Sequence, residues 1–431
     1  MIGGLCVAVV IILVALRVPV GIAMGLVAFG GIAAAVNPNA ALAILKSIPF
    51  EMVGDWNLSA IPMFLLMGYV AASSALTKNL FRSARILLGW LPGGLASATV
   101  VSAALFSSAS GSSVATAAAF ARSAVPEMLR AGYHPGLATG AVAAAGTLGA
   151  LIPPSVLMIV FGITMSQSIN SLFLSGVLPG ILSALVFIGY ITIRASFQPS
   201  LAPRDKEVLS SAERSEAFRD VWPLPLIILS VIGGIFAGWF TPTEAGAVGA
   251  ALTLVLAVVR KSLTRASFRD ALRRTATGTA SIFIIVVGAA LFQRLLGMTG
   301  MANLFSELVV GHIDTQLGLI LAITVLYLIL GCFLEPVSIM LLTLPVLAPV
   351  LQHYDVNLIW FNVIVVKLLE MGMVTPPMGM NIFVVKSAMG NAVTLGQVFR
   401  GASGFLLADF FTLGLIIAFP ILSLWLPTIS Q

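Results

Sequence analysis

Two stretches decide the fold: GTLGALIPPS at residues 146–155 and GMVTPPMGMN at residues 372–381. Each lies in the middle of an apolar segment, and in each a glycine stands four residues before two consecutive prolines. The prolines remove two backbone amide donors and leave carbonyl oxygens one turn earlier without partners, so we predict a helix that is broken at each stretch. Backbone that is not helical occurs at membrane depth only where it is buried in protein or lines a cavity.

The composition around these stretches indicates a membrane protein. Of the 431 residues, 59% are hydrophobic and only 9% are charged, and the mean hydropathy is +1.09. A soluble domain carries roughly 25% charged residues, so a soluble enzyme, a nucleic-acid-binding protein and a disordered scaffold are excluded. The net charge of +6 then reflects membrane topology, and Cys6 and Cys332 indicate no disulfide framework. We predict an all-α polytopic protein that lies in a lipid bilayer and has no nucleic-acid partner.

Apolar segments of about 20 residues predict the membrane spans. Two segments, 92–130 and 315–352, are too long for one span and hold small or polar residues at their centres, which favours re-entrant helical hairpins. The broken helices are predicted at 136–166 and 357–388. With this layout nearly all of the 22 Lys and Arg residues fall on the side of the basic loop 260–274. This asymmetry predicts that the basic loop is cytoplasmic and that both termini are periplasmic.

The sequence also contains an internal repeat. A shift of about 223 residues places Pro19 on Pro242 and superimposes the two Pro-Pro pairs. Loop 37–57 carries one lysine and two acidic residues, whereas its counterpart in the second half is strongly basic. We therefore predict two inverted-topology repeats, residues 1–196 and 222–431, joined by a cytoplasmic linker at 197–221. Inverted repeats with paired broken helices are typical of secondary transporters.

The hairpin centres and the breaks offer complementary chemistry. The first hairpin centre reads SSASGSS at residues 107–113, and the second reads GCFLEP at residues 331–336. Hydroxyls and freed carbonyls are hard oxygen ligands that suit a small alkali cation, whereas helix N-termini suit a carboxylate. We predict one cation site in each half, with an anionic substrate between or beside them. The alternative, that the small residues are only packing seams, is disfavoured because the repeat pairs all four features.

Ionisable residues within apolar segments are candidates for function. Lys367 and Glu370 lie one turn apart, and this spacing favours a structural ion pair. Glu335 either steadies the tip of the second hairpin or takes part in ion binding. Asp409 lies in the last span without a counterpart in the first half, and its role stays open.

Four motifs resemble those of the large membrane subunit (M, or DctM-type) of TRAP transporters, the tripartite ATP-independent periplasmic family. The motifs are WFTPTEAGAVG at 239–249, SGSSVAT at 110–116, the stretch 146–155, and Glu335-Pro336 followed by LLTLP at 341–345. The resemblance covers essentially the whole chain. It implies a transporter of the bacterial inner membrane that couples uptake to Na+, using two or more ions and no organic cofactor, by an elevator-type mechanism.

The resemblance also implies partners and substrates. The partners are a small membrane subunit, expected here as a separate chain, and a soluble periplasmic substrate-binding protein. The substrates are organic anions: C4-dicarboxylates, sialic acid, 2-oxo acids and sugar acids.

Carried over to this sequence, the resemblance implies three sets of site residues. The first sodium site would comprise Ser108, Ser110, Gly149, Ile152 and Pro154. The second would comprise Gly331, Glu335, Gly372, Thr375 and Met378. The residues expected to contact substrate are Ser112, Ser113, Thr116, Thr147 and Asn381.

Two other functions compete with this interpretation. The first is a self-sufficient sodium-coupled carboxylate symporter that needs no binding protein. The second is an intramembrane enzyme, suggested by Gly401-Ala402-Ser403-Gly404, which has the form of a rhomboid nucleophile motif. That chemistry needs a histidine base at membrane depth, and His134, His312 and His353 all fall at segment edges. We therefore expect a transporter and no enzymatic activity.

Overall fold

The computed structural model describes residues 2–74, 76–203 and 222–430, and within them it contains helices and no strands. Most of the predicted linker, from residue 204 to 221, lies outside the described residues. Six helices are long and apolar enough to cross a membrane, or seven if one bent pair is counted as a single span. The all-α polytopic fold expected from the sequence is confirmed.

The first half contains eleven α-helices and two short 3-10 helices among its described residues. They are α1 (Ile2–Ala15), α2 (Val20–Ala35), α3 (Pro38–Val53), η1 (Trp56–Ser59), α4 (Ala60–Ser73), α5 (Leu76–Leu88), α6 (Gly94–Ser110), α7 (Ser113–Arg130), α8 (Pro135–Gly146), α9 (Leu148–Leu151), α10 (Val156–Thr164), α11 (Ile169–Phe197) and η2 (Pro199–Leu201). The predicted loop 37–57 is in fact mostly helical, because Asn37 caps α3 by accepting a hydrogen bond from Ala40 N–H (2.7 Å).

The second half follows a comparable order in its described residues. It contains α13 (Pro223–Phe236), α14 (Pro242–Val259), α15 (Arg265–Thr299), α16 (Met301–Val310), α17 (Gln316–Gly331), α18 (Pro336–His353), α19 (Leu358–Gly372), α20 (Met380–Met389), η3 (Gly390–Ala392), α21 (Leu395–Ala418) and α22 (Ile421–Ile429). The last apolar segment is divided at Phe419-Pro420 into α21 and α22.

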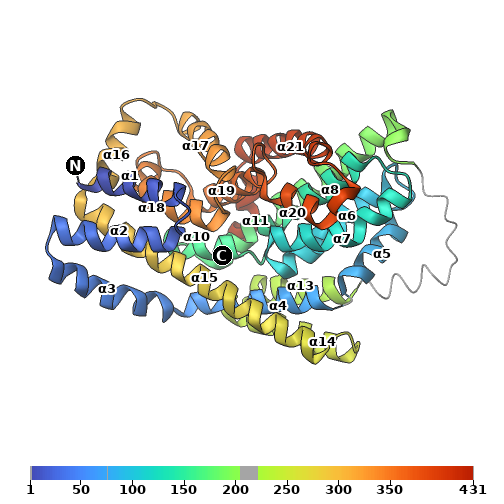
Figure 1. Cartoon of the computed structure of the whole chain (residues 1–431), viewed down its shortest axis with the longest axis horizontal. Helices are drawn as coiled ribbons and strands as arrows, with labels where there is room; N and C mark the ends of the chain where they lie inside the picture. The colour runs from blue at the N-terminus through green and yellow to red at the C-terminus, as the bar shows by residue number, and fades with distance from the viewer. Residues whose placement is uncertain (1, 75, 204–221, 431) are drawn as a thin grey trace.

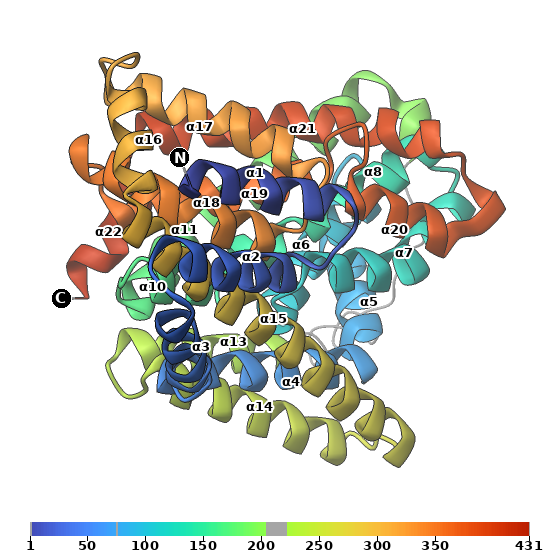
Figure 2. The ribbon, with the colours of Figure 1, turned by 60° about the vertical axis from the view of Figure 1, so that its left-hand side comes forward.

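In Figures 1 and 2, α4, α13 and α14 lie along the lower side, and α17 and α21 lie along the upper side. The long helix α15 packs against α2 and α4. Glycines allow the close approach there, since a Cβ atom on Gly288 would lie 2.1 Å from the carbonyl oxygen of Gly21.

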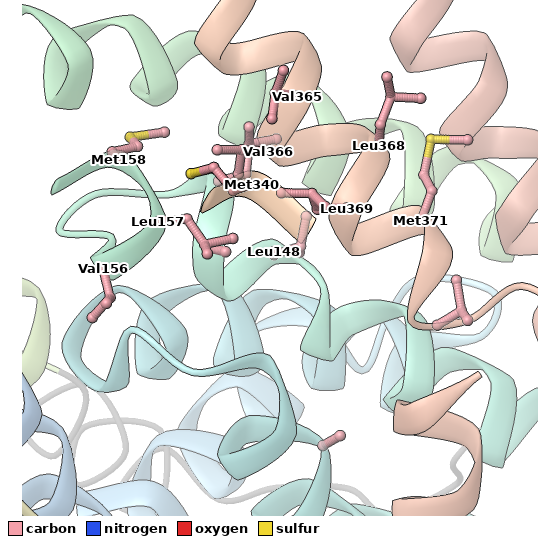
Figure 3. Close-up of a cluster of buried hydrophobic side chains, with 14 of the residues drawn as sticks. Leu148, Val156, Leu157, Met158, Met340, Val365, Val366, Leu368, Leu369 and Met371 are labelled. Carbon is pink, nitrogen blue, oxygen red and sulfur yellow. The ribbon is translucent and has the colours of Figure 1, made fainter. Parts of the chain in front are cut away.

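The two hairpins lie apart, with α19 between them. Both views show α17 and α18 toward the left, and α6 and α7 toward the right. Buried side chains of α9, α10, α18 and α19 belong to one hydrophobic cluster next to the breaks in the two broken helices (Figure 3). The residues labelled there are Leu148, Val156, Leu157, Met158, Met340, Val365, Val366, Leu368, Leu369 and Met371. The first broken helix therefore packs on the hairpin and the broken helix of the second half.

Candidate binding site between the hairpin tips

The first hairpin turns within two residues. Gly111, with φ +59°, ends α6, and its N–H donates to the carbonyl of Ser107 (2.7 Å). Ser112 then caps α7 by accepting a hydrogen bond from Ala115 N–H (3.3 Å). A left-handed conformation is accessible to glycine without a Cβ clash, so the sequence Gly-Ser both ends one helix and begins the next. The N-terminus of α7 is thereby held at the hairpin tip.

The first broken helix meets this tip. Residues 152–155 are not helical, and α10 leaves at 40° to the preceding pair α8 and α9. A Cβ atom on Gly149 would lie 2.8 Å from the Cβ of Ser107, and one on Gly111 would lie 3.7 Å from the carbonyl oxygen of Pro154. Gly149 and Pro154 therefore adjoin the hairpin tip.

The other residues proposed for the first sodium site vary in their placement. Ser110 Oγ lies 3.1 Å from Thr116 Oγ1 at the tip. Ser108 Oγ donates instead to the carbonyl of Leu105 (2.8 Å), within its own helix. The side chain of Ile152 packs on α11, where a Cβ on Gly180 would lie 2.5 Å from Ile152 Cγ1.

The second hairpin and the second break also touch. A Cβ atom on Gly372 would lie 2.6 Å from the Cα of Gly331, so the backbones of α17 and α19 are in contact. Glu335 precedes α18 and accepts a hydrogen bond from Ser338 Oγ (2.9 Å). Thr375 Oγ1 donates to the carbonyl of Met371 (2.7 Å). Met378 is 51% exposed.

A cavity of about 290 Å³ lies where these parts converge. Its lining includes the first residues of four helices: Ser113 and Val114 of α7, Val156 and Leu157 of α10, Pro336 and Val337 of α18, and Met380 of α20. A helix N-terminus carries a partial positive charge, which favours an anion. Both hairpins and both broken helices thus contribute one positive helix end each to a single cavity.

Five further lining residues were missed by sequence reasoning. Leu65 and Tyr69 of α4 face the cavity, as do Gly278, Ser281 and Ile282 of α15. These residues sit in ordinary apolar helices with no break or motif nearby, so only the packing of α4 and α15 against the hairpin tips identifies them.

Two carboxylates also line the cavity, Glu335 and Glu370. Glu370 is 2% exposed and accepts a hydrogen bond from Ser113 Oγ (2.6 Å) at the start of α7. No Lys, Arg or His occurs among the described residues of the lining.

The expected Lys367–Glu370 ion pair is wrong. Lys367 instead donates to the carboxylate of Asp409 on α21 and to Ser183 Oγ (3.1 Å) on α11. The two side chains are close in sequence, but they leave α19 toward different neighbours. The helices that pack against α19 determine the partner of each side chain. The spacing of three residues between Lys367 and Glu370 does not predict which helices these are. This contact also gives Asp409 a partner.

Of the five residues expected to contact substrate, Ser112 and Ser113 line the cavity. The other three do not belong to its lining. Thr116 Oγ1 donates to the carbonyl of Ser112 (2.9 Å), and Thr147 Oγ1 donates to that of Ala144 (2.6 Å). Asn381 Nδ2 donates to the carbonyl of Ala143 (3.3 Å), while its buried Oδ1 has no donor among the described residues.

The motif that suggested an enzyme is part of a helix contact. Ser403 is exposed and donates to the carbonyl of Arg400 (2.8 Å). A Cβ on Gly401 would lie 1.8 Å from the carbonyl oxygen of Gly136, so this glycine lets α8 and α21 touch.

Comparison with known proteins decides the family. Residues 7–422 match the family model described as "Tripartite ATP-independent periplasmic transporter, DctM component". The chain belongs to the DctM family of TRAP transporters. The resemblance seen in the sequence motifs is confirmed, and a multi-pass membrane transporter subunit follows from it.

Two curated DctM-family proteins are similar along most of their length. The SiaM large permease protein of the Vibrio cholerae sialic acid TRAP transporter is 33% identical over 381 residues, which is 87% of each chain. The C4-dicarboxylate TRAP transporter large permease protein DctM of Pseudomonas aeruginosa is 34% identical over 388 residues, or 88% of each chain. The fold is also similar to that of the Alcanivorax borkumensis YdaH transporter, with a TM-score of 0.60 at 15% identity over 90% of this chain and 89% of that one.

Proposed function

We propose that this chain is the subunit through which a Na+ gradient drives uptake of an organic anion across the bacterial inner membrane. The observation that supports this most is the convergence of four helix N-termini on one cavity built from both hairpins and both breaks. Such helix ends favour a carboxylate. Relatives named for sialic acid and for C4-dicarboxylates are almost equally similar, so they leave the anion open.

The charges of the lining support cation coupling. Two carboxylates and, among the described residues, no basic side chain surround the cavity, so an entering anion gains from cations bound nearby. The oxygen atoms available for Na+ at the first tip include Ser110 Oγ and the carbonyl of Pro154, which fit a hard cation. We propose one Na+ site at each hairpin tip, including Gly149 in the first half and Gly331, Glu335, Gly372 and Thr375 in the second.

The experiment measures uptake of labelled succinate and of labelled sialic acid into proteoliposomes that contain this chain and its small membrane subunit. We expect uptake to require an inward Na+ gradient and the cognate periplasmic binding protein together. Uptake that needs Na+ but no binding protein would identify the self-sufficient symporter instead. Equal uptake with and without the Na+ gradient would refute the coupling.

We also propose that residues 1–196 and 222–431 have inverted topology, that both termini are periplasmic, and that a domain carrying both hairpins moves by an elevator mechanism. The same order of hairpin and broken helix in each half supports this. The exposed Lys46 on α3 and the exposed Lys261 after α14 then lie on opposite sides of the membrane.

This topology predicts opposite labelling of two matched variants. In intact cells, Lys46→Cys is expected to react with a membrane-impermeant maleimide, whereas Lys261→Cys reacts only after permeabilisation. The native Cys6 and Cys332 are both buried, which keeps the background low. Labelling of both variants from outside would contradict the inverted arrangement.

A further inference from the structure

The core beside the cavity holds a buried group of charges that the proposed ion and substrate sites do not use. Lys367 and Asp409 are 3% and 0% exposed. The Lys367 ammonium donates to Asp409 and to Ser183, and it lies 5.6 Å from the centre of the Phe187 ring. The second carboxylate oxygen of Asp409 has no donor among the described residues, so Lys367 is the group that balances its charge.

This pair joins three helices from both halves of the chain. Lys367 lies on α19, Asp409 on α21, and Ser183 and Phe187 on α11. One turn further along α19, Glu370 holds Ser113 at the tip of the first hairpin, and α19 then ends at Gly372, where the second break begins. Helix α19 is therefore held to α11 and α21 through Lys367 and, one turn later, to the tip of the first hairpin through Glu370.

Stability alone is a poor explanation for such a pair. Removing two charges from water is costly, and replacing a buried ion pair by apolar residues of similar size is often neutral or stabilising. A bond between side chains on different helices does, however, restrict how each helix can rotate about its axis. Rotation of α19 would carry Glu370 away from Ser113, because helical neighbours three residues apart turn together.

We propose that Lys367 and Asp409 form a positioning pair that sets the rotation of α19. The pair thereby holds Glu370 against the first hairpin tip and orients the second break toward the cavity. The consequence for Na+ binding rests on the proposed function, whereas the consequence for the hairpin tip does not.

The test compares the parent chain with K367M/D409L in nanodiscs. We expect similar thermal stability, about fivefold faster amide hydrogen exchange in residues 111–116, and about a fivefold higher Na+ concentration for half-maximal uptake. The matched control is D270L/R274M, which removes the exposed i,i+4 pair on α15 and is expected to change none of these values.

Parent-like exchange and parent-like Na+ dependence in K367M/D409L would overturn the proposal, since the pair would then be only structural. If that variant does not fold, K367Q/D409N takes its place. It keeps polar groups but loses the charges, so we expect a shift of at least about twofold in the same direction, and parent-like values would overturn the proposal. If the parent shows no Na+-driven uptake, the proposed function fails, but the exchange measurement still decides whether the pair positions the tip.

Discussion

Replacement of Pro153 and Pro154 together by alanine is expected to abolish Na+-driven uptake while the protein still inserts into the membrane. Proline is about 3 kcal/mol less favourable than alanine at each interior helical position, so the two substitutions strongly favour a continuous helix from α9 into α10. In a continuous helix, the carbonyls near residue 152 would accept intrahelical hydrogen bonds. The N-terminus of α10 would then no longer exist at the cavity. We expect uptake to fall at least about a hundredfold, the cost of misplacing binding groups by more than an ångström.

The matched control is Pro179→Ala. Pro179 is also buried, but it lies inside the unbroken helix α11. Its replacement is expected to leave uptake within about twofold of the parent, because no break depends on it. Near-normal uptake by the Pro153/Pro154 double variant would show that the break is a packing feature without a role in transport.

Gly372→Ala is expected to have the second large effect. The added Cβ would meet three backbone atoms of Gly331, at 2.6, 2.9 and 3.2 Å, and none of them belongs to a flexible side chain. The substitution must push α17 away from α19 and so separate the second hairpin from the second break. Overpacking of this kind costs about 1–3 kcal/mol, and we expect a lower thermal midpoint together with at least a tenfold loss of uptake.

Gly189→Ala is the control for this substitution. Gly189 lies within α11, and apart from its own stretch of helix no described residue has a heavy atom within 4 Å of the position its Cβ would take. Alanine there is expected to be neutral or slightly stabilising, since it favours the helix by up to about 1 kcal/mol. If Gly372→Ala transports as well as Gly189→Ala does, contact between the hairpin and the break is not needed for transport.

Much of the site was predictable from local chemistry. Consecutive prolines interrupt the helix at 152–155 and again between Gly372 and Met380, as the sequence predicts. Single prolines are a weaker signal. Pro126, Pro179 and Pro345 all lie inside helices, although Pro420 stands between α21 and α22. A single missing amide leaves one carbonyl to be satisfied by a neighbour, whereas two adjacent prolines remove successive bonds of the same turn.

Side-chain direction was much less predictable. Ser113 and Thr116 belong to the same hydroxyl-rich motif, yet only Ser113 lines the cavity. Hydroxyls on a helix can instead donate to the carbonyl one turn back, as Thr116 and Thr147 do, and the sequence does not separate these outcomes.

The sequence by itself therefore determined the features that depend on residues close together in the chain. These are the apolar helices, the two hairpin turns, the two breaks and the family motifs. The tertiary structure alone decided that Lys367 pairs with Asp409, that Glu370 reaches Ser113, and that Tyr69 and Ser281 face the cavity. The physical reason is that each of these depends on how helices far apart in sequence rotate and pack against one another, and helix periodicity fixes a face without fixing its neighbour.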